Sequence, residues 1–266
     1  MKNNRYSIRK KIPSVKIVGA GPGSADLLTL RAFKAIKSAK VILYDALIGE
    51  DILEYASPKA KLVYVGKRAA NHSYSQEEIN KLIVDHAYNY GNVVRLKGGD
   101  PYIFGRGHEE YEYVTSFGID VEVVPGISSA IAVPELSNIP LTKRGVSESF
   151  WVLTATDKKG ELSKDIKDAV KTDATIVILM GVGKLDKVVK LFQQNNKGNV
   201  PVAIIQNGSL KSSKTVVANI DTIIDKAAHE KVGTPGIIVI GEVVATQPDF
   251  ALEQSEVLLN EYKALK

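Results

Sequence analysis

The sequence predicts an α/β protein built from two α/β domains. Short runs of aliphatic and β-branched residues, each of strand length, alternate with segments of helical period along the chain. Both halves show this alternation, and residues 138–149 between them have no hydrophobic periodicity. We therefore expect largely parallel sheets in two domains of comparable size, residues 15–137 and 150–246. Residues 1–14 are expected to form a basic flexible tail, 138–149 a linker and 247–266 a C-terminal extension.

The first half contains apolar runs that predict strands. They are Val15–Val18, Val41–Tyr44, Leu62–Val65, Val93–Leu96 and Val121–Val124. Helices are expected at Ala25–Lys37, capped by Ser24 or Asp26, at Gln76–Tyr90 and His108–Phe117, and through Ser128–Ala130 after Pro125-Gly126. The helix at Gln76–Tyr90 has the clearest boundaries. Ser75 and Glu78 have capping-box spacing, and Gly91 occupies the position of a C-terminal glycine cap.

The second half repeats the pattern without any short-period repeat or low-complexity tract. Strands are expected at Trp151–Thr154, Ile176–Met180, Val202–Ile205, Thr215–Val217 and Ile237–Ile240. Helices are expected at Asp165–Val170, Lys184–Gln193 and Ile220–His229.

The composition excludes several classes of protein. The 266 residues are 44% hydrophobic and 24% charged, which argues against a disordered or fibrous chain. With 0 Cys, the chain has no disulfide framework, thiolate zinc site, iron–sulfur cluster or cysteine nucleophile, and we expect a cytoplasmic protein. The basic N-terminus is not expected to begin a signal peptide, because glycines and a proline at 19–23 interrupt the following apolar segment. No membrane partner is expected.

The residues that follow the expected strands are rich in glycine and charge. In open α/β sheets, ligands bind beyond the carboxyl ends of the strands. Those loops are Gly19-Ala20-Gly21-Pro22-Gly23, Asp45, Gly66-Lys67-Arg68, Lys97-Gly98-Gly99-Asp100-Pro101, Pro125-Gly126-Ile127-Ser128-Ser129, Met180-Gly181 and Gln206-Asn207-Gly208. The glycines let a ligand approach the main chain closely. The cations Lys67, Arg68 and Lys97 favour an anionic ligand with several carboxylates, in keeping with the net charge of +5.

Other catalytic and cofactor motifs fit poorly. A dinucleotide-binding turn starting at Gly19 needs a third glycine at position 24, where Ser24 stands, and Pro22 lies inside the turn. The chain has no phosphate-binding P-loop and no Gly-x-Ser-x-Gly nucleophile elbow. The 4 histidines have no metal-ligand spacing, so no metal site is expected.

Taken together, these stretches resemble the tetrapyrrole methyltransferase family. The matching segments are Val18–Gly23 with Asp26–Leu30, Leu43–Leu47, Tyr64–Ala69, Ser75–Asn80, Val94–Pro101 with Phe104–Gly107, Val124–Ser129, Ile139–Arg144 and Gln206–Gly208. They occur in the family's order between about Val15 and Val244. The Val65-Gly66-Lys67-Arg68 stretch is more similar to members that methylate uroporphyrinogen III than to members that act on later corrin intermediates.

The resemblance implies transfer of methyl groups from S-adenosylmethionine to C2 and C7 of uroporphyrinogen III. The product would be precorrin-2, formed by way of precorrin-1 on the route to sirohaem and cobalamin, with S-adenosylhomocysteine released. In the family the donor lies in the cleft between two α/β domains of a homodimer. Donor contacts would fall on Pro22, Gly98, Gly99, Asp100, Ile103, Ser128, Ser129, Met180 and Gly208, and the acid/base pair on Asp45 and Lys67.

The chemistry of the residues is compatible with this reaction. Methyl transfer is a displacement that depends mainly on holding donor and acceptor in line. The pyrrole carbon becomes cationic as it takes the methyl group, and Asp45 is the candidate to stabilise that charge and help remove a proton. Because the substrate is a polycarboxylate, a basic cleft is expected. Its side chains would be Arg68, Arg106, Lys143 and Arg144, together with Lys67.

The sequence departs from the family pattern at three places and leaves alternatives open. Leu153-Thr154-Ala155-Thr156 stands where Thr-Gly-His is common, Lys143 where His is common, and Asn138 where Gly is usual. A related enzyme acting on another tetrapyrrole, or on another acceptor of the same donor, is an alternative. A nucleic-acid-binding protein is disfavoured, since no aromatic RNA motif or basic helix occurs. We expect a single-function enzyme without an appended dehydrogenase or chelatase domain.

Overall fold

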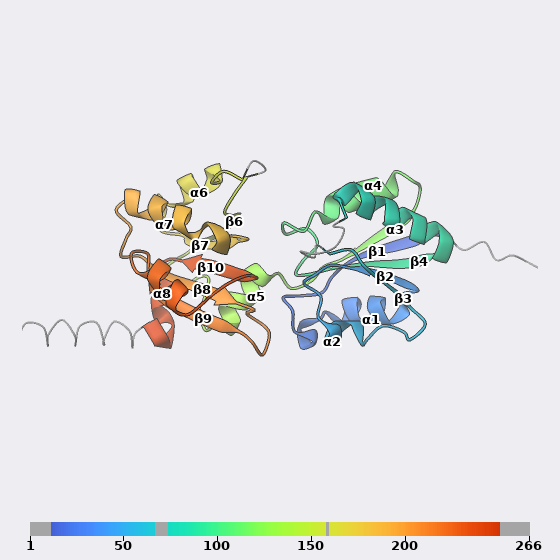
Figure 1. The fold of residues 1–266 in the computed structure, drawn as a ribbon, viewed down its shortest axis with the longest axis horizontal. Helices are drawn as coiled ribbons and strands as arrows, with labels where there is room; N and C mark the ends of the chain where they lie inside the picture. Colours follow the sequence, from blue (N-terminus) through green and yellow to red (C-terminus); the bar gives the residue numbers. More distant parts are fainter. Residues whose placement is uncertain (1–11, 67–73, 158–159, 251–266) are drawn as a thin grey trace, which may run out of the picture. The chain divides into compact units, whose positions relative to one another are not determined.

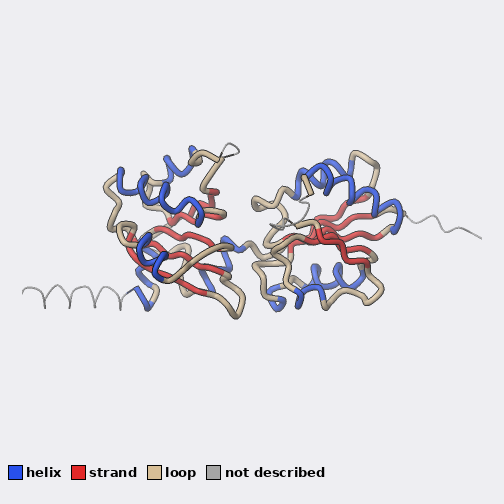
Figure 2. The backbone as a smooth tube through the Cα atoms, in the orientation of Figure 1, coloured by secondary structure: helices blue, strands red, loops and turns tan. Residues whose placement is uncertain are grey.

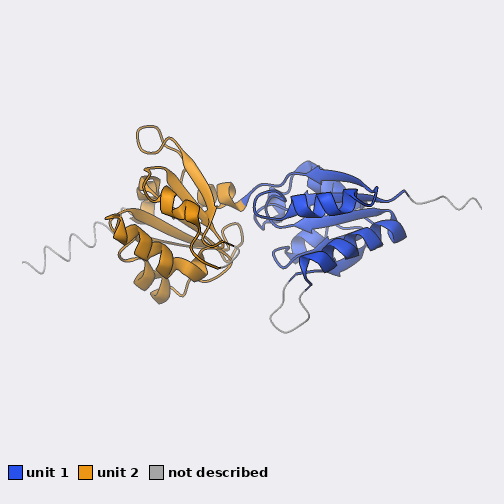
Figure 3. Ribbon diagram, turned by 90° about the horizontal axis from the view of Figure 1, so that it is seen from above, with its two compact units in different colours: residues 1–128 blue, residues 129–266 orange. Residues whose placement is uncertain are grey.

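A computed structural model describes residues 12–66, 74–157 and 160–250 of the chain. The chain divides into two compact units, residues 1–128 (unit 1) and 129–266 (unit 2) (Figure 3). The division therefore falls between Ser128 and Ser129, and not in the linker expected at 138–149. That segment belongs to unit 2, where Ile139 is buried in the hydrophobic core. Most of the expected N-terminal tail and C-terminal extension lies outside the described residues.

Unit 1 contains a five-stranded parallel sheet, as the sequence predicts. Its strands are β1 (Ser14–Gly19), β2 (Val41–Tyr44), β3 (Lys61–Tyr64), β4 (Asn92–Lys97) and β5 (Asp120–Val124). They lie in the order β3-β2-β4-β1-β5. The chain leaves β1 towards β2 and leaves β4 towards β5, so the connections from these two neighbouring strands run in opposite directions. Such a switch point opens a crevice for a ligand at the carboxyl ends of the strands.

Helices cover both faces of this sheet (Figures 1 and 2). The short helices η1 (Ala25–Leu27) and α2 (Glu50–Leu53) lie with α1 (Leu30–Ser38) on one face, and α3 (Gln76–Tyr90) and α4 (Gly107–Thr115) cover the other. Alternate residues of each strand supply the two cores, as the two-residue period of a buried strand requires. Val15 and Ile17 pack with α3 and α4, whereas Val18 packs with α1. The result is a three-layer α/β/α unit.

The starts of two helices test the sequence prediction in different ways. The capping box of α3 is confirmed: the Ser75 side chain accepts a hydrogen bond from the Glu78 N–H at 3.2 Å, and the Ser75 N–H donates to Glu78 Oε2 at 2.7 Å. The single helix expected at Ala25–Lys37 is wrong, because the backbone at Leu28 is extended and separates η1 from α1. The N-cap of α1 is Thr29, whose hydroxyl accepts from the Ala32 N–H at 3.1 Å.

Unit 2 contains a mixed sheet, so the expectation of largely parallel pairing is wrong here. Its strands β6 (Phe150–Thr154), β7 (Thr175–Leu179), β8 (Pro201–Gln206), β9 (Lys214–Asn219) and β10 (Gly236–Ile240) lie in the order β6-β7-β10-β8-β9. Among the described strands of this unit, only β6 and β7 pair in parallel; β10 runs antiparallel to both of its neighbours. The connection from β8 to β9 spans residues 207–213, which is enough for an antiparallel hairpin but too short for a parallel crossover.

Helices also cover both faces of the second sheet. Helices α6 (Lys164–Ala169), α7 (Leu185–Gln194) and α8 (Ile223–His229) pack on one face, with η2 (Val182–Lys184) beside them. Helix α5 (Ser129–Leu136) and η3 (Glu242–Thr246) pack on the other. Within the described ranges, no helix has both the length and the apolar character needed to cross a bilayer.

The capping box provides a test of how α3 is held. Replacement of its N-cap, Ser75→Ala, is expected to lower the free energy of unfolding by about 1 kcal/mol, because a backbone N–H at the helix start loses its acceptor. Urea denaturation would measure the change. The control is Lys81→Gln, beyond the first turn of α3, which removes a solvent-exposed ion pair with Glu77 and should have a smaller effect. Equal effects of the two substitutions would contradict the assigned cap.

Candidate active site

Three glycine loops meet at the carboxyl edge of the unit 1 sheet. Gly21 and Gly99 form a backbone bridge, in which the Gly99 N–H donates to the Gly21 carbonyl at 2.7 Å and the Gly21 N–H donates to the Gly99 carbonyl at 3.2 Å. A Cβ atom added to Gly19 would lie 2.6 Å from the Gly99 carbonyl oxygen and 2.6 Å from the Gly126 Cα. The loops after β1, β4 and β5 therefore touch through main-chain atoms, with no room for a side chain between them. This packing brings backbone N–H and C=O groups to the crevice edge.

Asp100 holds two of these loops together. Its Oδ1 accepts a hydrogen bond from the Tyr102 N–H at 2.8 Å, and its Oδ2 accepts one from the Gly126 N–H at 3.1 Å. The first bond stabilises the turn after β4, and the second joins that turn to the loop after β5. The carboxylate predicted to contact a methyl donor thus also shapes the loops around it.

The other residues predicted to contact the donor are divided between unit 1 and unit 2. In unit 1, Pro22 is half-buried, Ile103 is exposed, and Gly98 packs so closely on Leu47 that a Cβ would lie 2.9 Å from the Leu47 Cβ. Ser128 is the last residue of this unit.

In unit 2, Ser129 begins α5, Met180 follows β7, and Gly208 follows β8. Strands β7 and β8 both run antiparallel to β10, so Met180 and Gly208 lie at the same edge of that sheet. Met180 is exposed and has a positive φ of 56°. Asn138, which stands where the family usually has glycine, has a positive φ of 58°, a conformation that asparagine tolerates better than most residues.

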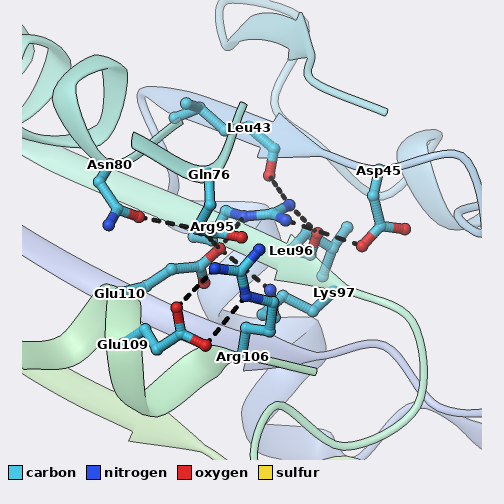
Figure 4. Close-up of polar contacts among 10 residues, drawn as sticks. All are labelled: Leu43, Asp45, Gln76, Asn80, Arg95, Leu96, Lys97, Arg106, Glu109 and Glu110. Carbon is cyan, nitrogen blue, oxygen red and sulfur yellow. Dashed lines mark hydrogen bonds and ion pairs between the residues drawn. The ribbon is translucent and has the colours of Figure 1, made fainter. Parts of the chain in front are cut away.

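Asp45, the predicted catalytic carboxylate, follows β2 at the same edge as the glycine loops of unit 1. Its Oδ1 accepts a hydrogen bond from the Leu47 N–H at 3.1 Å. Its Oδ2 lies 3.8 Å from the Arg95 Nη2 (Figure 4), which is an ion-pair distance, and the Asp45 side chain is 25% exposed. The carboxylate is therefore oriented by the protein yet open to a ligand.

A buried charge cluster adjoins Asp45, and sequence reasoning missed its importance. Glu110 of α4 is fully buried, and its Oε1 accepts from Arg95 Nε at 3.1 Å, Lys97 Nζ at 3.0 Å and Gln76 Nε2 at 3.1 Å (Figure 4). Arg95 and Lys97 are themselves 3% and 4% exposed. The available signal was the pair of cations, Arg95 and Lys97, at alternate positions of a central strand whose residues Val93, Val94 and Leu96 are aliphatic, because each buried cation needs a partner.

The location of Lys97 corrects one expectation. We expected this cation to face an anionic ligand beyond the sheet, but its ammonium group points into the unit and pairs with Glu110. Burial lowers the pKa of Lys97 below its ordinary value, and the nearby Arg95 charge lowers the pKa further, against the opposing effect of Glu110. Lys97 is therefore a structural cation of the core.

A cavity of about 400 Å³ opens beside Asp45. Its polar wall includes Asp45, Gln76, Arg95 and Arg106, and its apolar wall includes Ile79. Arg106 has an exposed side chain and forms a two-point ion pair with Glu109, at 2.9 Å from Nε to Oε1 and 2.6 Å from Nη2 to Oε2. The cavity thus combines a carboxylate with an accessible guanidinium group.

The remaining predicted substrate residues lie outside the described residues or in unit 2. Lys67 and Arg68 lie outside the described residues. Lys143 and Arg144 belong to an exposed turn of unit 2, in which the Lys143 N–H donates to the Ser147 carbonyl at 2.9 Å. Among the described residues, no cluster of three or more metal-ligating side chains occurs.

Comparison with known proteins identifies the family. Residues 14–224 match the family described as Tetrapyrrole (Corrin/Porphyrin) Methylases. The chain belongs to this family. This tetrapyrrole methylase is 48% identical to the Uroporphyrinogen-III C-methyltransferase of Methanocaldococcus jannaschii over 233 residues, which cover 86% of this chain and 96% of that protein. It is 42% identical to the enzyme of the same name from Bacillus subtilis, with 86% of this chain and 90% of that protein covered.

Solved structures of tetrapyrrole methylases confirm the predicted α/β fold. The Thermus thermophilus Uroporphyrin-III C-methyl transferase, complexed with S-adenyl homocysteine, is 37% identical, with a TM-score of 0.73 and coverage of 87% of this chain and 93% of that chain. The cobalt precorrin-4 methyltransferase CbiF is 25% identical, with a TM-score of 0.78 and coverage of 87% of this chain and 95% of that chain. The resemblance read from the loop motifs is therefore confirmed.

The contact of the three glycine loops can be tested by adding one methyl group. Gly19→Ala is expected to lower the free energy of unfolding by about 1–3 kcal/mol, because the new Cβ overlaps the backbone of two other loops. Chemical denaturation would measure this. Gly183→Ala in η2 is the matched control, since a Cβ there meets no atom within 4 Å. A Gly19→Ala variant as stable as the Gly183→Ala variant would show that the loops are not tightly packed.

Proposed function

We propose that the protein is an S-adenosylmethionine-dependent C-methyltransferase that converts uroporphyrinogen III to precorrin-2. Methylation at C2 and C7 would proceed by way of precorrin-1, in sirohaem and cobalamin biosynthesis. The observation that carries the proposal is the location of Asp45 beside the backbone-lined glycine loops, in a chain that matches uroporphyrinogen-III C-methyltransferases over nearly their full length. A related methyltransferase acting on another tetrapyrrole is the alternative.

The glycine loops suit a methyl donor of this kind. Close contact of the backbone at Gly19, Gly99 and Gly126 leaves a surface of main-chain groups that a flat, polar nucleoside can approach. When bound, S-adenosylmethionine supplies the electrophilic methyl group, and S-adenosylhomocysteine remains as the product. The residues proposed to hold it are Pro22, Gly98, Gly99, Asp100, Ile103 and Ser128 of unit 1, and Ser129, Met180 and Gly208 of unit 2. No metal is part of the proposal.

The acceptor side of the reaction depends on charge. Asp45 is held by the Leu47 N–H and faces the cavity, so its carboxylate can stabilise the positive charge that the pyrrole ring develops on methylation and accept the proton that the methylated macrocycle then loses. Lys67 is proposed as the acid/base partner. The carboxylates of the substrate are proposed to pair with Arg68, Arg106, Lys143 and Arg144. Where the partner is an arginine, two-point pairing gives a carboxylate both affinity and orientation. In this scheme Arg106 exchanges Glu109 for a substrate carboxylate.

The assembly and location are also proposals. Resemblance to the family supports a homodimer, and a composition with 0 Cys is compatible with a reducing cytoplasm. The partner is proposed to be the small-molecule substrate, with neither nucleic acid nor membrane involved.

Product analysis tests the reaction directly. After anaerobic incubation of the protein with uroporphyrinogen III and S-adenosylmethionine, mass spectrometry should show an acceptor that carries two added methyl groups. A trapped single addition would indicate a slow second transfer. If the acceptor gains no mass but calorimetry shows that S-adenosylhomocysteine binds, the protein would still be assigned as a methyltransferase, and uroporphyrinogen III would be excluded as its acceptor. Precorrin-2, offered as acceptor in parallel, would then test the alternative.

The role of Asp45 can be separated from binding. Asp45→Asn is expected to lower kcat by about 10²- to 10⁴-fold, because the side chain loses its negative charge and its ability to accept a proton. Affinity for S-adenosylhomocysteine, measured by calorimetry, should not change. The control is Asp120→Asn, an exposed acid at the amino end of β5, at the opposite edge of the same sheet. Equal loss of binding and turnover in Asp45→Asn would mean that this residue is structural.

A further inference from the structure

The central strand β4 carries two buried positive charges, and Glu110, the carboxylate that pairs with both, neutralises only one of them. Arg95 and Lys97 project from alternate positions onto the face covered by α3 and α4, and both are almost fully buried. Glu110 is the buried carboxylate that both cations contact. Two buried cations and one buried anion leave a surplus of one positive charge in the interior, which is costly unless another anion lies close. The carboxylate that meets this requirement is Asp45, 3.8 Å from Arg95.

The hydrogen bonds of Arg95 fix its orientation. Its Nε donates to Glu110, and its Nη1 donates to the Leu96 carbonyl at 2.9 Å and the Leu43 carbonyl at 3.5 Å. Leu43 is the residue of β2 in register with Arg95, so the guanidinium group spans from β4 to the strand that immediately precedes Asp45. Only Nη2 is left to face Asp45 (Figure 4). Because the fork is rigid and held by fixed acceptors, the position of Nη2 is set by the fold.

The same contacts distinguish Arg95 from a substrate-binding arginine. A residue that captures a substrate carboxylate needs an accessible pair of N–H donors, as Arg106 has at the edge of the cavity. Arg95 is 3% exposed and uses its Nε and Nη1 on protein acceptors. Its remaining nitrogen, Nη2, lies 3.8 Å from the Asp45 carboxylate at the wall of the cavity.

We propose that Arg95 is a positioning residue for the methyl transfer, which holds the Asp45 carboxylate aimed at the cavity. Leu47 fixes one carboxylate oxygen of Asp45 and Arg95 attracts the other, so together they define the direction of the group. Glu110, held by Lys97 and Gln76, anchors Arg95 from the opposite side. The inference rests on the proposed function, since it assigns Asp45 to the reacting pyrrole carbon.

A double-mutant cycle in kcat tests this coupling. Wild type, Arg95→Met, Asp45→Asn and the double variant are assayed with uroporphyrinogen III and S-adenosylmethionine. Arg95→Met should lower kcat by about 10- to 100-fold through misplacement of the carboxylate, with KM for uroporphyrinogen III and affinity for S-adenosylhomocysteine unchanged. In the Asp45→Asn background the same substitution should cause little further loss, because the group that Arg95 positions is already disabled.

The choice of variants keeps folding separate from coupling. Arg95→Met leaves Lys97 and Glu110 as a balanced buried pair, so no uncompensated charge remains between them. Arg95→Lys keeps the charge but lacks the fork, and it should recover part of the lost kcat. If Arg95→Met shows no cooperative unfolding transition, Arg95→Lys takes its place in the cycle.

Lys97→Met is the matched control. It removes the other cation that contacts Glu110, and its effect on kcat should persist in the Asp45→Asn background.

The outcomes are distinguishable. An Arg95 substitution that lowers kcat by the same factor with and without the Asp45 carboxylate would overturn the proposal, because the arginine would then act through the fold alone. A parallel loss of affinity for S-adenosylhomocysteine would also overturn it. A wild-type protein that adds no methyl group to uroporphyrinogen III would overturn the proposed function, and this inference with it.

Discussion

Backbone contact among Gly19, Gly99 and Gly126 is the constraint on which the carboxyl edge of unit 1 depends. A single Cβ at Gly19 would lie 2.6 Å from atoms of both other loops, so the loops after β1, β4 and β5 reach these positions only without side chains. The bridge between Gly21 and Gly99 and the Asp100 bond to Gly126 then hold the three loops as one surface. Because the five strands are parallel, their carboxyl ends lie at one edge of the sheet, and Asp45, which follows β2, lies at that edge too.

Below this surface, the protein places charge where a parallel sheet ordinarily places aliphatic residues. Arg95, Lys97 and Glu110 occupy the layer between β4 and the helices α3 and α4, at a desolvation cost that hydrogen bonds and opposite charges must offset. The same layer holds aliphatic residues such as Val93 and Ile83 at the far end of the strand. The charges are therefore confined to the end of β4 that adjoins the cavity, where they can act on Asp45.

The two units solve the same packing problem with different topologies. Both bury a five-stranded sheet between two helical layers, but β10 enters the sheet of unit 2 antiparallel to both neighbours. Even so, β7 and β8 keep a common direction, so Met180 and Gly208 share one sheet edge, much as the glycine loops share an edge in unit 1. Loops after co-directional strands are thus the recurrent source of candidate site residues in this chain.

Local patterns in the sequence determined the elements, the loop motifs and the family. The capping box at Ser75 and the strand-length apolar runs depend on neighbouring residues alone, and they appear in the structure where the pattern predicts them. Tertiary structure decided what depends on distant residues: the direction of β10, the inclusion of 138–149 in unit 2, and the break at Leu28 that moves the cap of α1 to Thr29. It also decided that Lys97 faces Glu110 in the core, because only the docking of α4 on the sheet brings residues 13 positions apart into contact. Spacing along the chain cannot reveal which partner a buried charge will find.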